Sequence, residues 1–513
     1  MLDVLVVGAG PTGLVHALWL HAQGVNVRII DKTEGPGTTS RAMAVQSRTL
    51  ELYRQLGLTD EVVSAGFRTP AMNMWARGKH RLRVPLQEIG TGISPHPYIL
   101  VYPQDFHEKT LVAKLQSFGI EVERNTELLS LEDKGEHVEA RLRHADGTEE
   151  ITSARYLAAC DGASSTVRKQ LGIGFEGGTY QHVFYVADVD LSGLDNTGEA
   201  HVALNGEDFV VVLFYDSSGK ARLIGTVRDE RADHPEKLTF DDVGHEAMAS
   251  VGIHVDKVNW FSHYRVHHRV ADRFRQGRVF LMGDAGHVHS PVGGQGMNTG
   301  ILDAINLAWK LAAVIHGQAP DALLDTYATE RLAFAHELVK TTDRVFSLIT
   351  ADGEFANLMR SYGVPLIAGA AFKIGSTREM LFKMVSQTGL AYKDSALSEG
   401  SAGEVQGGER LPWVNVDGQD NFEPLPVIGW QVHVYGTATA EVRAWCVQNG
   451  VTLRQFAWAE EHGEAGLKQD AVYLLRPDTW VALADPDGSA DTLDAYFTSR
   501  SYQIGKEQGG VRD

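Results

Sequence analysis

The residues best suited to chemistry stand close together in the segment GRVFLMGDAGHVHSPVGGQGMNTGILDAINLAWKLA, residues 277–312. An apolar run ends there on Gly283 and Asp284, and a loop rich in glycine leads into a helical pattern. Glycines leave backbone N–H groups uncovered, and the N-terminus of a helix carries a partial positive charge. This combination favours an anionic ligand; the alternative is a tight strand-to-helix turn that binds nothing.

A second glycine-rich turn stands at the start of the chain, in LDVLVVGAGPTGLVHALWL. Gly8, Gly10 and Gly13 have the GxGxxG spacing between a strand pattern and a helix pattern. In such a turn the first glycine permits the tight bend, the second admits a pyrophosphate, and the third lets helix and strand pack closely. Asp31 ends the next strand pattern, where a carboxylate can bind a ribose. The sequence therefore predicts a dinucleotide site.

A third acid, Asp161, lies in ARYLAACDGASSTVRKQLGI, residues 154–173. Asp161 and Gly162 follow an apolar strand pattern and precede a helix pattern that carries Arg168. Because α/β sheets bind ligands at the carboxyl ends of their strands, one cofactor long enough to reach three strand ends is predicted. A reduced isoalloxazine ring carries negative charge over N1 and the C2 carbonyl. It is the kind of anion that the glycine-rich loop within residues 277–312 suits.

The elements that must position these residues follow from the hydrophobic pattern. Residues 2–31 read as a strand, a helix and a second strand. The apolar residues of the helix after the glycine-rich loop step by four, three and four, as one helix face should; they are Ile301, Ile305, Ala308 and Ala312.

The rest of the chain divides by pattern. Residues 71–103 and 175–275 alternate apolar and polar positions, as strands of a sheet do. Residues 351–400 are expected to form a helical connection that ends in a loop boundary. Residues 401–513 alternate strand and helix patterns, and the lone Cys446 falls in one of these helices, which favours a packing or dimerisation role for it.

Taken together, GAGPTG, CDGASSTVR and GDAGHVHSPVGGQGMNTGILDAINLAWKL resemble the motifs of the single-component, FAD-dependent aromatic hydroxylases. These are the class A flavoprotein monooxygenases of the p-hydroxybenzoate hydroxylase superfamily, and the resemblance is nearest to the phenol hydroxylase and polyketide hydroxylase branches. It extends over about the first 350 residues, and the third motif is its most specific part.

The resemblance implies an α/β fold. A Rossmann-like FAD-binding domain would comprise residues 1–70, 104–174 and 276–350. An interleaved β-sheet substrate domain would comprise residues 71–103 and 175–275, and a thioredoxin-like C-terminal domain residues 401–513.

The resemblance also implies the reaction. NADPH or NADH would reduce FAD as a transient reductant without a Rossmann domain of its own. O2 would then add to the flavin, and the C4a-hydroperoxide would transfer oxygen to a phenolic or polycyclic aromatic substrate. The protein would exclude water and orient the substrate.

The same resemblance assigns residues to the parts of FAD. Gly8 to Gly13 and Asp31 would hold the ADP half, Arg41 and Gln104 the phosphate and ribityl region, and Leu128 would lie near the adenine. Asp284 would bind the ribityl chain. The full set of expected cofactor-binding residues is Gly8, Gly10, Pro11, Thr12, Gly13, Asp31, Lys32, Arg41, Gln104, Leu128, Asp161, Gly162, Asp284, Pro291, Gly294, Gly296, Met297 and Asn298.

No base that would activate the substrate is identified. Phenol hydroxylases carry an acidic residue shortly after the segment that matches Arg41, where this chain has Ala42 and Met43. His263 and Arg269 would share one face of a strand and are candidates, as is Pro291 beside the flavin; the alternative is a solvated or packing surface.

No metal site is predicted. His263 and His267 have a spacing that binds metal on a helix, but their segment reads as a strand. His287 and His289 are expected to fix their loop through backbone hydrogen bonds.

Two other functions remain open. A flavin-dependent halogenase shares this fold, but none of the nine tryptophans stands in the WxWxIP segment of those enzymes. The other alternative is a non-catalytic flavoprotein that uses FAD as a redox-sensitive element and binds a partner through its C-terminal domain.

Composition narrows the partners. The 47 Lys and Arg against 66 Asp and Glu give a formal net charge of −19, which disfavours nucleic acid and anionic membrane surfaces. No apolar run reaches the roughly 18 residues of a membrane span. Two cysteines in no metal or disulfide spacing favour the cytoplasm. The expected partners are a small aromatic substrate and O2, and a homodimer stays open.

Overall fold

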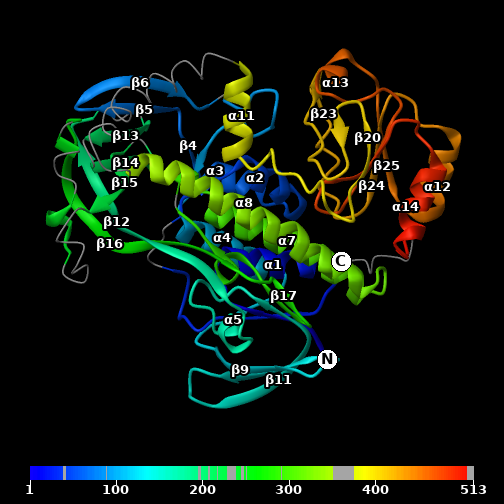
Figure 1. Cartoon of the computed structure of the whole chain (residues 1–513), viewed down its shortest axis with the longest axis horizontal. Coiled ribbons are helices and arrows are strands. Elements are labelled where there is room, and N and C mark those ends of the chain that lie inside the picture. The colour runs from blue at the N-terminus through cyan, green and yellow to red at the C-terminus, as the bar shows by residue number, and fades with distance from the viewer. Residues whose placement is uncertain are drawn as a thin grey trace.

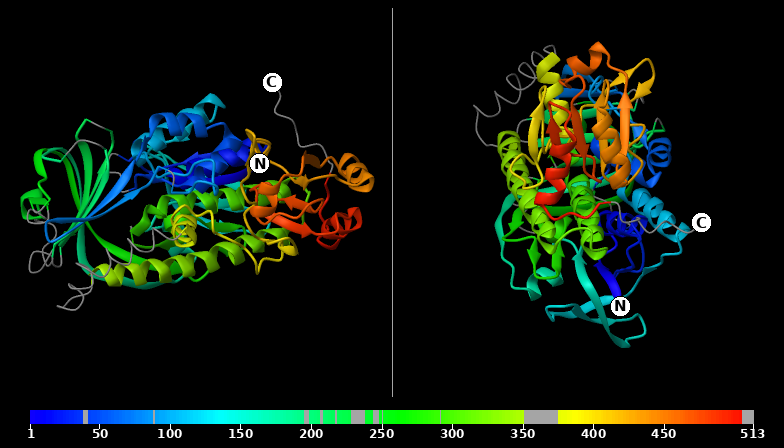
Figure 2. Two further views of the ribbon diagram at one scale, coloured as in Figure 1. Left: turned by 90° about the horizontal axis from the view of Figure 1, so that it is seen from above. Right: turned by 90° about the vertical axis from the view of Figure 1, so that its right-hand side faces the viewer.

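The computed structural model describes residues 1–504 except 38–41, 88, 195–197, 206–207, 217, 228–237, 244–247, 250, 291 and 351–374. The described residues form three larger sheets, which Figures 1 and 2 show as three parts of an elongated molecule. The N-terminal sheet lies in the middle, a second sheet at one end, and the C-terminal sheet, in orange and red, at the other (Figure 2, left).

The N-terminal sheet has the strand order β17-β18-β11-β1-β2-β8, and β10 and β9 extend it beyond β11. Its central strands β18, β11, β1, β2 and β8 run parallel. Strands of a parallel sheet are covered on both faces, which explains the continuous apolar run Val4 to Val7. The strands are β1 (Leu2–Val7), β2 (Val27–Ile30), β8 (Val122–Glu123), β9 (Glu127–Asp133), β10 (Val138–Arg143), β11 (Glu149–Ala159), β17 (Arg275–Gln276) and β18 (Val279–Leu281).

Helices α1 and α7 pack closely against each other beside this sheet. A side chain at Gly300 of α7 would overlap the hydroxyl of Thr12 in α1, so the glycine permits this approach. Helix α7 is buried on all sides from Asn298 to Ala312, which fits its largely apolar sequence. The helices before the C-terminal region are α1 (Pro11–Ala22), α2 (Ser47–Tyr53), α3 (Thr59–Ala65), α4 (Gln104–Ser117), α5 (Thr166–Gln170), α7 (Gly296–Ile315), α8 (Asp325–Thr350) and α11 (Gly375–Val385).

The second sheet has the order β19-β16-β12-β15-β14-β13-β5-β6. One face of it carries an apolar cluster that includes Val183, Tyr185 and Leu223. Its last strand, β19, comes from the glycine-rich segment and pairs with β16, so it links this sheet to the turn after β18. The strands are β5 (Ala71–Ala76), β6 (Lys79–Pro85), β12 (Phe175–Ser192), β13 (Ala200–Asn205), β14 (Asp208–Phe214), β15 (Lys220–Val227), β16 (His254–Ala271) and β19 (His287–Val288).

The C-terminal sheet has the order β21-β20-β27-β26-β24-β25. Cys446 of α12 is buried in the apolar cluster of this part, among Val442, Trp445 and Phe497, so within the described residues its role is packing. The elements are β20 (Glu399–Ala402), β21 (Val405–Gln406), β24 (Gln431–Tyr435), α12 (Ala440–Asn449), β25 (Thr452–Phe456), α13 (Glu460–Glu464), β26 (Val472–Leu475), β27 (Val481–Asp485) and α14 (Ala490–Ser499).

Smaller elements complete the fold. A three-stranded sheet joins β3 (Ala44–Val45), β7 (Leu100–Val101) and β4 (Phe67–Arg68), and β22 (Asn415–Val416) pairs with β23 (Gln419–Asp420). Among the helices of the described residues, none combines the length and apolar character that crossing a membrane requires. The same residues contain no group of three or more His, Cys, Asp or Glu side chains arranged to hold a metal ion. Of the expected connection, residues 351–374 lie outside the described residues, and the rest, residues 375–400, begins with helix α11.

Candidate functional site

Four strand ends meet at one edge of the N-terminal sheet. The register pairs Val7 with both Ala159 and Ile30, and Ala159 with Leu281. The strands are parallel, so the segments that follow them lie side by side at their carboxyl ends. These segments carry the residues singled out from the sequence, namely Gly8, Asp31, Asp161 and Asp284.

The three glycines of the first turn differ in what surrounds them. Gly8 has a φ of +104°, and an added Cβ would overlap the carbonyl group of Cys160. A Cβ on Gly13 would overlap the carbonyl oxygen of Gly8. At Gly10, by contrast, a Cβ would meet nothing within 4 Å. Gly8 and Gly13 therefore serve the packing of strand and helix, and the open space at Gly10 fits the approach of a pyrophosphate.

Asp31 joins the first turn to the end of β2. Its Oδ2 accepts a hydrogen bond of 2.6 Å from the backbone N–H of Ala9, and its Oδ1 accepts one of 2.7 Å from that of Thr33. Arg124 stands 4.0 Å from the same carboxylate, and its buried Nη2 has no hydrogen-bond partner among the described residues. A buried donor without a partner fits a missing polar ligand on this side of the edge. The side chain of Lys32 is exposed.

Asp284 is the exposed residue of an otherwise buried turn. Gly283 and Ala285 on either side of it are buried. Gly283 has a φ of +55°, and an added Cβ would lie 2.7 Å from the hydroxyl of Thr12, so a larger residue would collide with α1. The fold thus holds the backbone tightly and leaves the Asp284 carboxylate on the open side of the turn.

Asp161 stabilises the turn in which it stands. Its Oδ2 accepts hydrogen bonds of 2.7 Å and 3.1 Å from the N–H groups of Thr166 and Val167 at the start of α5, while its buried Oδ1 has no partner among the described residues. Arg168 donates bonds of 2.7 Å to the carbonyl of Ala285 and 2.8 Å to that of Ala163. Arg168 therefore ties the turn after β11 to the turn that carries Asp284, a contact that the sequence did not reveal.

The glycine-rich loop has the backbone that its sequence requires. Gly293 and Gly294 have φ values of +78° and +61°, in the left-handed region that favours glycine. Helix α7 begins at Gly296, and its N-cap residue Gln295 makes no side-chain capping bond. The positive end of α7 is thus available to a negatively charged group.

Asn298 fastens this loop rather than facing open space. Its side-chain Oδ1 accepts bonds of 2.9 Å from the Gln46 backbone N–H and from the Thr49 hydroxyl. Its Nδ2 donates to the carbonyls of Ala44 and Gly294 at 2.9 Å and 3.0 Å. With its side chain fully used, Asn298 can face a ligand only through its backbone.

The expected role of His287 is wrong. Its Nε2 lies 2.7 Å from Oδ2 of Asp303, so it bonds to a side chain of α7 and not to the backbone of its loop. His289 does bond to backbone, with Nδ1 at 2.8 Å from the carbonyl of Ser290. Burial lowers the pKa of His289 to about 4, so this imidazole is neutral at pH 7.

Two buried charged residues behind the turn were missed from the sequence. Asp303 accepts a bond of 2.9 Å from the N–H of Gly283, and Arg331 of α8 donates to it at 2.5 Å. Burial would raise the pKa of Asp303, but the charges of Arg331 and His287 hold it below its ordinary value. The sequence contained one signal of this pair, namely Asp303 within an otherwise apolar helix pattern. A buried acid of this kind requires a buried partner.

Other expected residues fall in less informative places. Gln104 begins α4; its backbone N–H donates to the Ala42 carbonyl at 3.1 Å and its side chain to Glu108 at 2.8 Å. Leu128 is buried in the main core, and Met297 packs against that core. The structure does not describe Arg41 and Pro291.

The two strand candidates separate. Arg269 lies opposite Val288 of β19, and burial together with the charge of Arg269 lowers the pKa of Arg168, which places Arg269 near the Asp161 turn. His263 lies opposite Tyr185, further along β16, and makes a ring contact with Phe261. Of the two candidates, the structure brings only Arg269 toward the strand ends.

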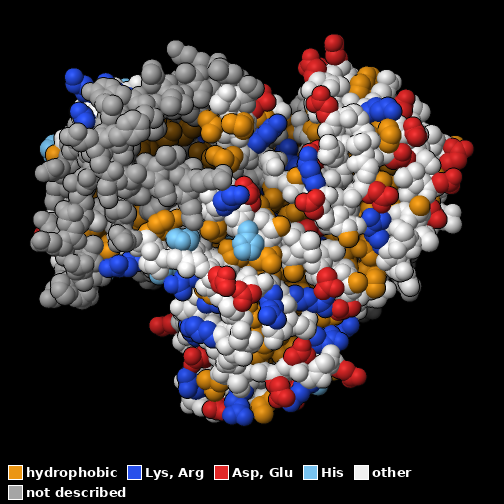
Figure 3. Space-filling model, viewed as in Figure 1, with side chains coloured by type: hydrophobic (Ala, Val, Ile, Leu, Met, Phe, Trp, Pro, Cys, Tyr) orange, Lys and Arg blue, Asp and Glu red, His pale blue; other side chains and the backbone are white. Residues whose placement is uncertain are grey.

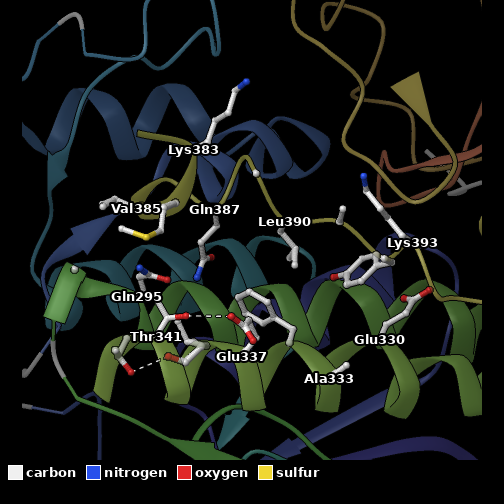
Figure 4. Close-up of a pocket in the computed structure, with 18 of the residues that line it drawn as sticks. Gln295, Glu330, Ala333, Glu337, Thr341, Lys383, Val385, Gln387, Leu390 and Lys393 are labelled. Carbon is white, nitrogen blue, oxygen red and sulfur yellow. Dashed lines mark hydrogen bonds between the residues drawn. The ribbon is translucent and has the colours of Figure 1, made fainter. Parts of the chain in front are cut away.

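A cavity of about 1050 Å³ opens beside the glycine-rich loop. It is bordered by Gly293 and Gln295, by α8, by α11 and by residues 387–395 (Figure 4). Hydrophobic side chains gather around α11 on the surface (Figure 3), where Met380 is 62% exposed. The side chains that these elements contribute to the cavity include Phe334, Leu338, Met384, Leu390, Lys383 and Glu337.

Comparisons with known proteins agree with this geometry. The FAD binding domain family matches residues 1–342. The chain is 35% identical over 409 residues to 6-methylpretetramide 4-monooxygenase of Streptomyces rimosus, covering 79% of this chain and 72% of that protein. It is 32% identical to pentachlorophenol 4-monooxygenase of Sphingobium chlorophenolicum over 68% of this chain and 65% of that protein.

A solved structure extends the likeness to the whole chain. The anhydrotetracycline hydroxylase OxyS from Streptomyces rimosus superposes with a TM-score of 0.78 at 26% identity, covering 98% of this chain and 99% of that one. These similar proteins are named as monooxygenases or hydroxylases, and the halogenase and non-catalytic alternatives gain no support. The chain belongs to the family of single-component, FAD-dependent aromatic monooxygenases, which use NAD(P)H and O2.

Proposed function

We propose that this monooxygenase hydroxylates a multi-ring phenolic compound that binds in the cavity beside Gly293 and Gln295. The observation that carries the proposal is the volume of about 1050 Å³, at the upper end of the ~300–1,000 Å³ typical of ligand pockets. A single phenol ring would leave most of this space unfilled. Two of the similar proteins are named for 6-methylpretetramide and anhydrotetracycline, which supports the larger class of substrate.

The lining of the cavity suits flat aromatic rings. Phe334 of α8 and Met384 of α11 offer apolar and polarisable contacts, and Leu390 adds a further apolar wall. Lys383 and Lys393 stand at the same cavity, and Figure 4 shows their side chains extending from α11 and from the segment after it.

FAD would lie along the edge where the four strands end. The open space at Gly10 would take the pyrophosphate, Asp31 the ribose, and Asp284 the ribityl chain. The isoalloxazine ring would face the N-terminus of α7. The proposed cofactor contacts are those of Gly8, Gly10, Pro11, Thr12, Gly13, Asp31, Lys32, Arg41, Gln104, Leu128, Asp161, Gly162, Asp284, Pro291, Gly294, Gly296, Met297 and Asn298.

When bound, FAD takes up reducing equivalents from NADPH or NADH and passes one oxygen atom of O2 to the aromatic ring. The chain has the remaining tasks. The backbone N–H groups at the start of α7 stabilise negative charge on the ring system that they face. The cavity walls hold the substrate ring in place and keep bulk water out, which protects the oxygen transfer.

We also propose bounds for the three domains of the molecule. The FAD-binding domain would comprise residues 1–70, 104–174 and 276–350, and the substrate domain residues 71–103 and 175–275. In the C-terminal domain, residues 401–513, four strands have the order β27-β26-β24-β25, with β24 and β25 parallel and joined by α12. That arrangement supports a thioredoxin-like domain. Cytoplasmic location and a homodimer are further expectations.

The substrate proposal is tested by filling the cavity. Ala333 lines it and stands on the exposed side of α8, so Ala333→Trp would occupy part of the volume without disturbing the core. We expect the KM for a four-ring phenol to rise about tenfold while kcat/KM for a one-ring phenol changes little. His336→Trp is the matched control, because His336 is exposed on the same helix and does not line the cavity. Acceleration of NADPH oxidation by one-ring phenols alone would refute the proposal.

A further inference from the structure

A loop of the C-terminal sheet reaches into the FAD-binding part of the molecule. It connects β26 to β27, and its residue Arg476 is fully buried. Arg476 donates hydrogen bonds of 2.7 Å and 3.1 Å to the two carboxylate oxygens of Glu330 in α8. Asp478 of the same loop accepts a bond of 2.9 Å from the indole N–H of Trp309 in α7. The two parts are thus joined by buried polar contacts.

Glu330 is the centre of these contacts. Besides Arg476, it accepts bonds of 2.6 Å from Asn306, 2.7 Å from Lys310 and 2.6 Å from the hydroxyl of Ser395. Burial would raise the pKa of Glu330, but the charges of Arg476 and Lys310 hold it well below its ordinary value. The carboxylate is therefore ionised, and a buried ion with so many partners tolerates little displacement.

The contacts continue toward the strand ends through Tyr392 and Arg331. The guanidinium of Arg476 lies 5.3 Å from the centre of the Tyr392 ring. The Tyr392 hydroxyl accepts a bond of 2.9 Å from Nη1 of Arg331, which follows Glu330 directly in α8. Nε of Arg331 donates to Asp303 at 2.5 Å. Each of these side chains is nearly or fully inaccessible to solvent, so they move together or not at all.

The series ends at the turn that presents Asp284. Oδ2 of Asp303 accepts the bond from the N–H of Gly283, the residue directly before Asp284. The same oxygen contacts His287, three residues after Asp284. A shift of Arg331 would therefore be passed to the backbone that carries Asp284.

We propose that Arg476 of the C-terminal region is a positioning residue for the Gly283–Asp284 turn, acting through Glu330, Tyr392, Arg331 and Asp303. The proposal rests on the family's use of FAD and on the placement of Asp284 beside it. It gives the C-terminal region a part in holding the cofactor.

A second contact between the same parts supplies a matched control. Arg410, also from the C-terminal region, donates at 2.9 Å and 2.6 Å to the buried carboxylate of Glu51 in α2. Glu51 contacts Arg48 and Ser94, and Arg48 donates to the Asp478 carbonyl and the Thr479 hydroxyl of the β26–β27 loop. Arg410 itself makes no hydrogen bond to Glu330, Tyr392, Arg331 or Asp303 among the described residues. Arg410→Gln and Arg476→Gln thus remove the same kind of buried pair, and only the second removes the direct bonds to Glu330.

The test compares FAD affinity, flavin reduction potential and hydrogen exchange of the Gly283 amide in the two variant holoenzymes and the wild type. We expect Arg476→Gln to weaken FAD binding about tenfold and to reduce protection of the Gly283 amide. Arg410→Gln should lower the melting temperature but leave the FAD affinity and the protection of the Gly283 amide within twofold of the wild type. Arg476→Lys should recover part of the FAD affinity.

Equal FAD affinities, potentials and Gly283 protection in the two variants would overturn the proposal, because both contacts would then be purely structural. If Arg476→Gln does not fold, Tyr392→Phe removes a single hydroxyl from the series and must loosen the Gly283 amide on its own. Normal Gly283 protection in that variant would also overturn the proposal. A wild-type protein that binds no FAD would refute the function instead, so the two failures are distinguishable.

Discussion

Three glycines in one turn obey different constraints. At Gly8 and Gly13 an added Cβ would overlap backbone atoms of the protein itself. At Gly10 the surrounding space is open, and its φ of −75° is one that any residue adopts. The fold therefore does not need glycine at position 10, and we propose that the cofactor does.

Substitution at Gly10 should separate binding from folding. We expect Gly10→Val to weaken FAD binding at least about tenfold because its side chain fills the pyrophosphate space, with less than about 1 kcal/mol lost in unfolding free energy. Gly13→Ala should instead destabilise the protein by about 1–3 kcal/mol through overpacking. Isothermal titration with FAD and urea unfolding measure the two effects, and a Gly10 variant with normal FAD affinity would contradict the assignment.

Asp284 gives a second prediction at the scale of one residue. Because its side chain is exposed in a buried turn, Asp284→Ala should fold normally and be purified largely without flavin. The ratio of absorbance at 450 nm to that at 280 nm, taken on this variant and on a control, Asp146→Ala in the exposed turn before β11, measures the loss. Full retention of FAD by Asp284→Ala would remove the central role of this turn.

Sequence reasoning succeeds for residues whose role is local. The GxGxxG spacing predicts the tight bend at Gly8 and the close packing at Gly13, because both depend on neighbours in the same βαβ unit. His287 was misjudged because its partner, Asp303, comes from a different element. The orphaned donor of Arg124 and the fastening role of Asn298 depend on three-dimensional proximity in the same way.

Among the elements, we propose that helix α7 affects flavin chemistry most directly. Its N-terminus follows two left-handed glycines and makes no side-chain capping bond. If the flavin ring faces this end as proposed, the partial positive charge there would stabilise the reduced, anionic ring more than the oxidised one and so raise the reduction potential.

Disturbing that helix start should lower the potential. The Cβ of a valine at position 296 would lie in ordinary contact with His289, 3.7 Å from its Nε2, and the two further methyl groups would crowd the space in front of the helix start. Loss of about 1 kcal/mol from the helix terminus would lower the two-electron potential by about 20 mV. Ala313→Val, near the other end of α7, is the control. A potential in flavin-loaded Gly296→Val equal to that of the control would count against the dipole role.

The elements themselves were predicted unevenly. The parallel direction of β18, β11, β1 and β2 follows from four apolar strand patterns that each end in a turn with an acid or a glycine, whereas their order does not. Alternation in residues 175–275 indicates strands but cannot give the sheet order, since pairings such as β13 with β5 join segments more than a hundred residues apart. The strand β19 inside the glycine-rich segment was not expected, because two residues carry no periodicity.

For the whole molecule, stability should depend on the buried ion pairs that join the C-terminal region to the FAD-binding part. Burial would raise the pKa of Glu51, but Arg410 and Arg48 lower it from 4.5 to about 2. A carboxylate with a depressed folded-state pKa adds stability above its unfolded pKa and loses it as the pH falls toward the folded value. The shift corresponds to about 3 kcal/mol at neutral pH.

Glu51→Gln should therefore reduce the unfolding free energy by about 3 kcal/mol at pH 7, and the difference from the wild type should shrink as the pH falls below 4.5. Urea unfolding between pH 7 and pH 3 measures this difference. If the difference in unfolding free energy between the two proteins stays constant over this pH range, the charge of the Glu51 carboxylate does not hold the two parts together.

Whether this protein is an aromatic monooxygenase is best tested by its absorbance spectrum after purification and by its consumption of NADPH and NADH in air. The assay would use a panel of one-ring and multi-ring phenols, with mass analysis of the products. We expect a flavin spectrum, NAD(P)H oxidation that accelerates with multi-ring phenols, and a product heavier by one oxygen atom. A protein that stays colourless with added FAD, or one that oxidises NAD(P)H at the same rate with every aromatic compound and leaves each unchanged, would contradict it.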